Sequence, residues 1–181
     1  MRILAIGGSL RHGSYNRRLL QAAAEAAPGT VHIWDGLALV PPFNEDHEAA
    51  LPSAVADLRR AIEEADSVLI ATPEYNGSVP GQLKNALDWA SRPFRSNPLR
   101  DKPVAVVGAS PSPRGAASAQ AEVRKVLRVI GARVVGPEFA VSEVHERFDA
   151  DGRLSDDVIR ARLGELLAQL ALATTDVVVA A

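Results

Sequence analysis

The feature that most constrains the fold is a regular alternation between short apolar runs and longer segments with helical periodicity. Four runs have the length and the β-branched content of buried strands, at residues 2–6, 30–35, 67–71 and 104–109. Residues 133–135 and 138–141 together offer a fifth strand that a glycine and a proline interrupt. Because helical patterns separate these strands, we expect an α/β fold whose parallel sheet has helices on both faces.

The length of the chain points to one domain. It has 181 residues, and a typical domain has about 150 residues. It contains neither an internal repeat nor a linker, so we expect a single domain over residues 1–173. Residues 174–181 read TTDVVVAA. We expect them to form a C-terminal tail, although a strand docked on a neighbour is an alternative.

The composition excludes several classes of protein. A net charge of -2 argues against nucleic acid or an anionic membrane as the main partner. The chain has no cysteine, which excludes disulfides, thiolate metal sites and cysteine nucleophiles. Its four histidines are scattered without the spacing of metal ligands. The first apolar run lacks the pattern of a signal peptide and no run could span a bilayer, so we expect a cytoplasmic protein.

The loop between the first strand and the first helix has the features of an anion site. It reads GGSLRHGSYN at residues 7–16. A helix N-terminus offers free N–H groups, Ser9, Ser14 and Asn16 add neutral donors, and Arg11 adds a charged one. The spacing differs from G-x-G-x-x-G, so a terminal monophosphate fits better than a pyrophosphate. In the alternative interpretation, Ser14 only caps the helix and Arg11 is solvated.

The turn after the third strand has the features of a cradle for a flat ligand. Residues 72–89 read TPEYNGSVPGQLKNALDW, in which proline, asparagine and glycine fix an unusual backbone path. We interpret this turn as presenting N–H groups and the ring of Tyr75 to a ligand with polar edges. Alternatively, the turn is merely sharp and Tyr75 is packed.

The predicted topology brings these two loops together. In the flavodoxin-like strand order 2-1-3-4-5, the chain reverses direction between the first and third strands, and the ligand crevice opens there. The anion loop follows strand one and the Tyr75 loop follows strand three. We therefore expect a flavodoxin-like three-layer sandwich with a five-stranded parallel sheet. A phosphate at one loop and a planar heterocycle at the other describe FMN.

The two motifs together resemble the family of NAD(P)H-dependent FMN reductases, which are flavodoxin-like quinone, chromate and azo-dye reductases. The resemblance is carried by GSLRHGSYN at residues 8–16 and PEYNGSVPGQLKNALDW at residues 73–89, and it covers nearly the whole chain in element order. It implies non-covalent FMN with four residues around the phosphate, Ser9, Arg11, Ser14 and Asn16. It also implies contacts along the ribityl chain and the isoalloxazine edge from Pro73, Glu74, Tyr75, Asn76, Gly77 and Ser78.

A third loop corresponds in position to the family's loop on the other side of the flavin ring. Residues 110–115 read SPSPRG, with two prolines where many relatives carry more glycine. The resemblance implies contacts from Ser110, Arg114 and Gly115.

The resemblance also implies the reaction. NAD(P)H passes a hydride to bound FMN and leaves, and a small acceptor such as a quinone or a free flavin then takes the electrons. We expect no catalytic acid or base, because Glu74 in its turn is equally suited to accept backbone N–H groups. The implied assembly is a homodimer or homotetramer, with the helix after Pro80 and residues 36–50 as the expected interface.

A second hypothesis comes from a different class of function. It is a non-catalytic FMN-binding electron carrier or redox-responsive regulatory protein. Such a carrier usually gains from strong charge asymmetry, which this chain lacks.

Overall fold

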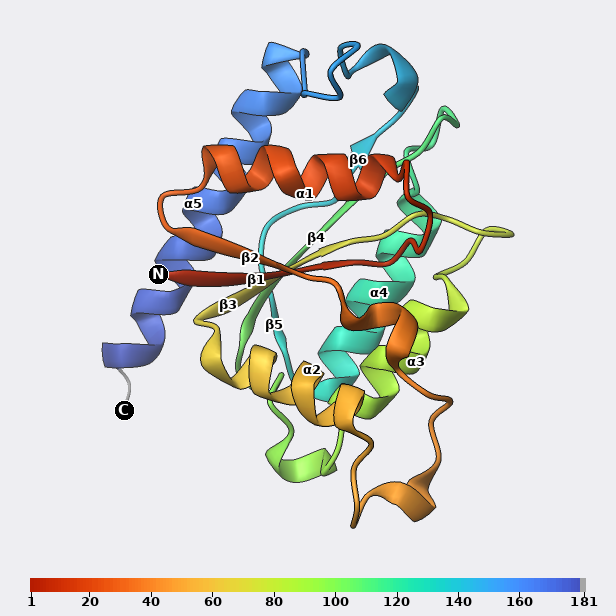
Figure 1. Cartoon of the computed structure of the whole chain (residues 1–181). Coiled ribbons are helices and arrows are strands. Elements are labelled where there is room, and N and C mark those ends of the chain that lie inside the picture. Colours follow the sequence, from red (N-terminus) through yellow and green to blue (C-terminus); the bar gives the residue numbers. More distant parts are fainter. Residues whose placement is uncertain (180–181) are drawn as a thin grey trace.

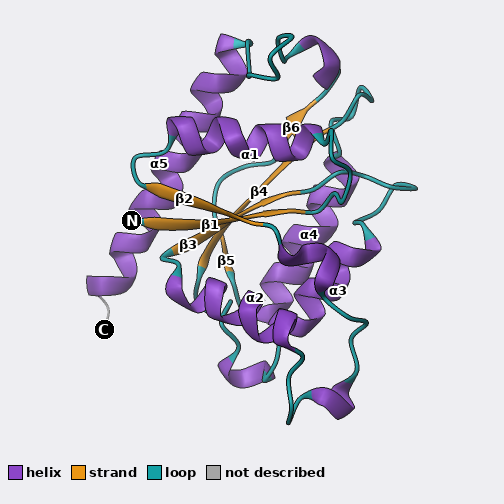
Figure 2. Cartoon of the chain, in the orientation of Figure 1, coloured by secondary structure: helices purple, strands orange, loops and turns teal. Residues whose placement is uncertain are grey.

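The computed structural model describes the backbone of residues 1–179 and the side chains of residues 1–175. Strands and helices alternate along the chain (Figures 1 and 2). Their order is β1 (Arg2–Gly7), α1 (Tyr15–Ala26), β2 (Thr30–Trp34), α2 (Ser53–Glu64), β3 (Ser67–Ala71), α3 (Gly81–Ala90), β4 (Pro103–Ala109), α4 (Ala117–Ile130), β5 (Arg133–Val134), β6 (Phe139–Val141) and α5 (Asp157–Val179). Short 3₁₀ turns in the described part of the chain are η1 (Gly36–Leu39), η2 (Glu45–His47), η3 (Phe94–Ser96) and η4 (Val144–Glu146).

All paired strands of the sheet are parallel, and their order is β2-β1-β3-β4-β5. The predicted flavodoxin-like topology is therefore confirmed. The predicted fifth strand is divided in two, because β5 pairs with the start of β4 and β6 pairs with its end. Gly136 between them has a left-handed backbone with φ of 71°, and Pro137 has no N–H to donate to the sheet.

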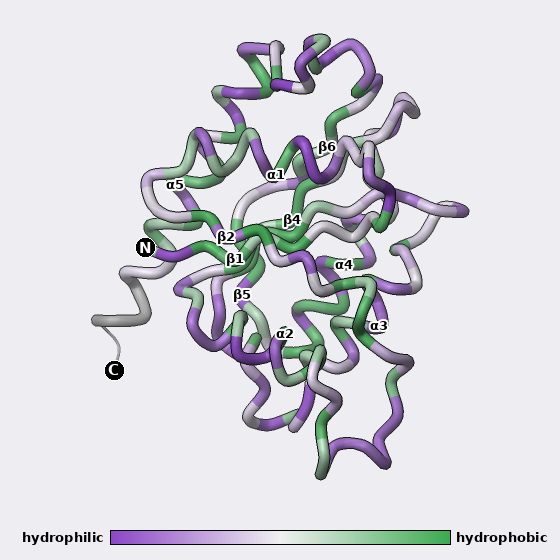
Figure 3. The backbone as a smooth tube through the Cα atoms, in the orientation of Figure 1, coloured by the Kyte–Doolittle hydropathy of each residue, from purple (hydrophilic) through white to green (hydrophobic). Residues whose placement is uncertain are grey.

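Two helical layers cover the two faces of the sheet. Successive strand residues point to opposite faces, so Leu4 and Ile6 pack against α2, α3 and α4, whereas Ile3 and Ala5 pack against α1 and α5. Figure 3 shows the hydrophobic strands at the centre of the molecule, between helices whose outer turns are hydrophilic. This burial on both faces is the three-layer arrangement that the sequence predicts.

Helix α5 is longer than the sequence pattern predicts. The sequence predicts a C-terminal tail from residue 174, yet the helix continues to Val179. The hydroxyls of Thr174 and Thr175 donate to the carbonyls of Ala171 and Leu172, so these residues are accommodated within the helix. Residues 180–181 of the predicted tail lie outside the described residues. Among the helices that the structure describes, none has the length and apolar character needed to cross a membrane.

Candidate ligand-binding site

Three loops meet at the carboxyl ends of the neighbouring strands β1, β3 and β4 (Figure 1). We call them the first loop (residues 8–14), the Tyr75 loop (residues 72–80) and the third loop (residues 110–116). The Gly8 N–H donates to the Ala71 carbonyl at 2.8 Å. A Cβ at Gly8 would lie 2.8 Å from the Leu83 side chain and 3.3 Å from that of Pro73. Only glycine therefore allows the first two loops to approach so closely.

The first loop ends at the N-terminus of α1, where N–H groups are free. The buried Ser14 hydroxyl accepts from the Arg17 N–H and caps the helix. Within the described part of the chain, the N–H groups of Gly13, Tyr15 and Asn16 have no protein acceptor. These groups and the helix dipole make the loop suited to an anion.

Arg11 closes the first loop upon itself. Its guanidinium donates to the Gly13 carbonyl at 2.7 Å and lies 5.7 Å from the centre of the Tyr15 ring. Its backbone N–H donates to the Ser9 hydroxyl at 3.3 Å. The side chain is exposed but not free in solvent, because these contacts hold the cation beside the helix N-terminus. A guanidinium has five N–H donors, so most of them stay available to a ligand.

The Asn16 side chain has a structural partner that the sequence did not reveal. Its amide nitrogen donates to the Ala109 carbonyl at 2.9 Å, and its amide oxygen accepts from the Ala109 N–H at 3.0 Å. Asn16 is only 3% exposed. The side chain predicted to contact phosphate is thus engaged with the end of β4, and the free group that Asn16 offers is its backbone N–H.

The Tyr75 loop contains a two-residue hairpin. Tyr75 and Ser78 exchange two backbone hydrogen bonds of 3.1 Å, and Asn76 and Gly77 between them have φ of 54° and 75°. Positive φ at both central positions is the signature of a type I′ turn, for which Asn-Gly is the preferred sequence. Tyr75 is 51% exposed, so the interpretation of a packed tyrosine is wrong.

A hydrogen bond joins the first loop to this hairpin. The Ser9 and Tyr75 hydroxyls lie 3.3 Å apart. This contact crosses from the end of β1 to the end of β3, where the strand order reverses. Open parallel sheets bind their ligands at that point.

Two carboxylates tie the Tyr75 loop to α4. The Glu74 carboxylate accepts from the Ala119 N–H at 3.1 Å, in the first turn of that helix. The predicted alternative role of Glu74, as an acceptor for backbone N–H groups, is thereby confirmed. Glu122 accepts from the Ser78 hydroxyl at 2.6 Å and from the Val79 N–H at 3.0 Å. These two hydrogen bonds, the one from Ser78 first, lower the pKa of Glu122.

The third loop combines an exposed tip with a tightly packed end. The half-buried Ser110 hydroxyl accepts from the Ser112 N–H at 3.1 Å, and Arg114 is exposed. Gly115 is buried with φ of 55°, and a Cβ there would lie 2.8 Å from the carbonyl carbon of Val141. Packing against β6 thus accounts for this glycine without a ligand.

Two residues of α4 that hold the site were missed in the sequence. One is Glu122, which carries no readable signal because an exposed glutamate is ordinary on a helix. The other is Gln120, which is fully buried, donates to the Gly115 carbonyl at 3.3 Å and accepts from the Phe139 N–H at 3.1 Å. Gln120 lies in line with the buried Val123 and Leu127. A polar residue on an apolar stripe indicates a buried hydrogen bond.

The first loop, the Tyr75 loop and the strand order define a flavodoxin-like flavoprotein, because anion donors and an exposed aromatic ring flank the switch point of the sheet. A family model described as NADPH-dependent FMN reductase matches residues 1–146. The chain belongs to this family and is accordingly an oxidoreductase with FMN as its cofactor.

Comparison with individual proteins agrees with this assignment. The chain is 42% identical over 175 residues to an NAD(P)H-dependent FMN reductase of Pseudomonas aeruginosa, covering 95% of this chain and 94% of the relative. It is 35% identical over 165 residues to 2-hydroxy-1,4-benzoquinone reductase of a Burkholderia species, covering 90% of each chain. Among solved structures it is similar to FerB, a flavoenzyme NAD(P)H:(acceptor) oxidoreductase from Paracoccus denitrificans. That match has a TM-score of 0.85, 34% identity, and coverage of 95% of this chain and 98% of FerB.

Proposed function

We propose that this chain is an NAD(P)H-dependent reductase that passes electrons through FMN, held across the first loop and the Tyr75 loop, to a quinone-type or free flavin acceptor. The observation that carries the proposal is the hydrogen bond between the Ser9 and Tyr75 hydroxyls. It joins an anion loop to an exposed aromatic ring at the switch point, and a flavin mononucleotide has a phosphate and a flat ring at matching ends.

The donors of the first loop fit a monophosphate. The hydroxyls of Ser9 and Ser14, the guanidinium of Arg11 and the backbone N–H groups of Gly13, Tyr15 and Asn16 supply neutral and charged donors without a lysine. The ring and the ribityl chain are assigned to the other two loops. The residues proposed there are Pro73, Glu74, Tyr75, Asn76, Gly77, Ser78, Ser110, Arg114 and Gly115.

The protein contributes positioning and electrostatics to the reaction. Bound FMN supplies the hydride-accepting chemistry. Glu74 accepts a hydrogen bond from the N-terminus of α4, and Glu122 accepts hydrogen bonds from the hairpin. We therefore propose that the two carboxylates orient the loop and that neither transfers a proton in the reaction. The exposed hairpin leaves one side of the site open, which suits a cycle in which the nicotinamide leaves before the acceptor enters.

The visible absorption spectrum of the purified protein tests this proposal. We expect a flavin spectrum that bleaches on anaerobic addition of NADPH or NADH and returns on addition of a benzoquinone. Steady turnover with the quinone is expected as well. A flavin that stays oxidised in the presence of both nucleotides would favour the electron-carrier hypothesis, and a protein that takes up no FMN would contradict the site itself.

We further propose that the enzyme is a cytoplasmic homodimer or homotetramer, with NAD(P)H and the acceptor as its small-molecule partners. Leu39 in η1 and Phe94 in η3 are 74% and 49% exposed and lie on the segments that adjoin α3. Aromatic side chains such as that of Phe94 are enriched in subunit interfaces. Light scattering of the wild type and of Leu39→Lys tests the interface, since the charge is expected to lower the measured mass.

A further inference from the structure

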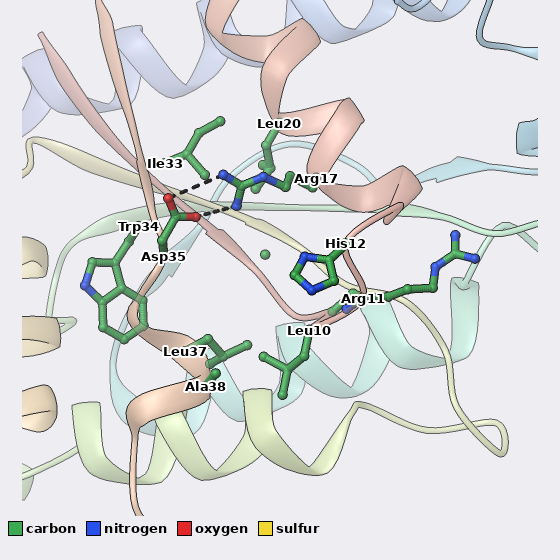
Figure 4. Close-up of a pocket in the computed structure, with 12 residues that line it drawn as sticks. Leu10, Arg11, His12, Arg17, Leu20, Ile33, Trp34, Asp35, Leu37 and Ala38 are labelled. Carbon is green, nitrogen blue, oxygen red and sulfur yellow. Dashed lines mark hydrogen bonds and ion pairs between the residues drawn. The ribbon is translucent and has the colours of Figure 1, made fainter. Parts of the chain in front are cut away.

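A cavity of about 370 Å³ lies beside the first loop, on the side that faces β2 (Figure 4). Figure 4 shows His12 and Trp34 on opposite walls, and the guanidinium of Arg11 directed away from the cavity. The volume is within the range of roughly 300 to 1,000 Å³ that is usual for small-molecule sites. The first loop lines both this cavity and the proposed FMN site, whereas the residues that line the cavity do not include the Tyr75 loop or the third loop.

The lining of this cavity is divided by polarity. Arg17 and Asp35 face each other on one side, whereas the aliphatic side chains of Leu10, Leu37 and Ala38 gather on another (Figure 4). A ligand that matches this division has hydroxyl and anionic groups at one end and a flat, weakly polar group at the other. A nucleoside phosphate has this arrangement.

Asp35 is placed to accept hydrogen bonds from such a ligand. It directly follows β2, and both its oxygens contact the Arg17 guanidinium, the second at 3.3 Å. The Arg17 hydrogen bond lowers the pKa of Asp35, so the carboxylate is ionised at neutral pH. Its side chain is still 65% exposed, and a carboxylate paired with one guanidinium keeps further lone pairs free.

The walls of the cavity are fixed by contacts outside it. The Gln82 amide nitrogen donates to the Leu37 carbonyl at 2.8 Å and to the Val40 carbonyl at 2.9 Å, which holds η1 against α3. The indole N–H of Trp34 donates to Asp57 at 2.8 Å. Because these contacts hold the backbone on both sides of Asp35, little ordering is needed on binding.

We propose that this cavity binds the adenosine phosphate end of a nucleotide, with Asp35 accepting from a ribose hydroxyl and with Leu10, Leu37 and Ala38 against the base. In doubly wound sheets that bind dinucleotides, an acidic residue after the second strand has this role toward the ribose. Arg17 supplies positive charge for the phosphate, and the His12 ring offers a further hydrogen-bonding group. The inference rests on the proposed function in one respect, because the adenylate half of NAD(P)H is one source of this chemistry. A separate adenine nucleotide is the other source.

The test uses the FMN-loaded protein and 5′-AMP as the probe. We expect 5′-AMP to bind in calorimetry, and Asp35→Asn to weaken that binding by about tenfold, the scale of one hydrogen bond to a charged group. Asp157→Asn is the matched control, because Asp157 is also an exposed aspartate paired with an arginine, Arg160, but lies outside the cavity. Ala38→Phe, which narrows the cavity and keeps the ion pair, is expected to weaken 5′-AMP binding as well.

The kinetics distinguish the two sources. If 5′-AMP competes with NADH and Asp35→Asn raises the KM for NADH with little change in kcat, the cosubstrate is the source. If 5′-AMP binds without competing, a separate nucleotide is the source, and the site is supported in either case. Absence of 5′-AMP binding to the wild type at about 10 mM would overturn the inference. Failure of the proposed function has a different signature, namely a flavin that neither NADH nor NADPH bleaches.

Discussion

Two kinds of loop in this molecule resemble each other in sequence and differ in what holds them. Residues 36–50 and the loops after β1 and β3 are all irregular and rich in proline, glycine and polar side chains. Residues 36–50 are held by hydrogen bonds from side chains on one face of α3 and in the turn after it. Four side chains with helical spacing reach the segment, and they are Gln82, Asn85, Trp89 and Arg92.

Side chains of α3 form hydrogen bonds with backbone groups in the middle of this segment. Asn85 donates to the Pro41 carbonyl at 2.9 Å and accepts from the Phe43 N–H at 2.8 Å. The Trp89 indole donates to the same Pro41 carbonyl at 2.8 Å, and Arg92 donates to Glu45 at 2.9 Å. The long segment therefore has a structural role over most of its length, although its composition resembles that of the two ligand-binding loops.

The first loop and the Tyr75 loop differ because they place free groups at the switch point of the sheet. N–H groups at the start of α1 are unpaired within the described part of the chain, and the ring of Tyr75 is half exposed. The comparison teaches that composition identifies a loop, whereas free donors and an exposed ring at the switch point identify a binding site. Substitutions in the two regions should thus affect different quantities.

The largest effect is expected from Trp89→Ala, on stability. Trp89 is fully buried and packs edge-to-face on Phe43 with ring centres 4.9 Å apart. Truncating a buried aromatic side chain costs about 3–5 kcal/mol. Denaturant unfolding of the FMN-free protein measures the loss, and Trp89→Phe should lose less because it keeps most of the packing. An equal loss in both variants would mean that the hydrogen bond to Pro41 dominates.

Arg11→Ala is expected to affect FMN affinity and leave stability nearly unchanged. Loss of a charged hydrogen bond to the phosphate should weaken FMN binding by about 1.5–3 kcal/mol, measured by titration of the FMN-free protein. Arg18→Ala is the matched control, because Arg18 also lies over the Tyr15 ring, at 5.4 Å, but is absent from the first loop. Unchanged FMN affinity in Arg11→Ala would contradict the phosphate assignment.

A smaller effect on stability is expected from Asn85→Ala. The change leaves the Phe43 N–H without its acceptor, and an unsatisfied donor of this kind costs about 1–3 kcal/mol. Because Trp89 still donates to the Pro41 carbonyl, we expect the lower half of that range. Denaturant unfolding measures the loss, and FMN affinity should stay within about twofold. Weaker FMN binding would show that the long segment contributes to the site after all.

The sequence predicted the features of the fold that depend on local pattern. The strand β3 was predicted with its bounds, at residues 67–71, and the alternation of strands and helices predicted the parallel sheet. These predictions succeed because burial on both faces requires continuous apolar runs. The Asn-Gly turn of the Tyr75 loop follows from local backbone preference in the same way.

The features that the sequence could not show are pairings across the fold. Asn16 bonds Ala109, and Glu74 bonds the N-terminus of α4. An asparagine in a helix first turn or an acid in a tight turn suits a ligand and a distant backbone group equally well. The helical spacing of the polar residues on α3 can be recognised in the sequence. Their partner, the segment 36–50, becomes evident only in the structure.

The smallest effect is expected from Glu122→Gln, on the pH dependence of stability. The pKa of Glu122 lies below its ordinary value of 4.5 because the ionised form accepts from Ser78 and Val79. A lowered pKa means that the contribution is fully present above the ordinary value and is lost as the pH falls through the folded value. The free energy of unfolding of the FMN-free wild type, measured from neutral pH down to about pH 4, should therefore decline at the acid end. In Glu122→Gln the free energy of unfolding should be slightly lower at neutral pH and decline less, whereas the exposed Glu138→Gln should follow the wild type. Parallel curves for all three proteins would show that the hairpin keeps its position without the carboxylate, and that its backbone pairing alone presents Tyr75.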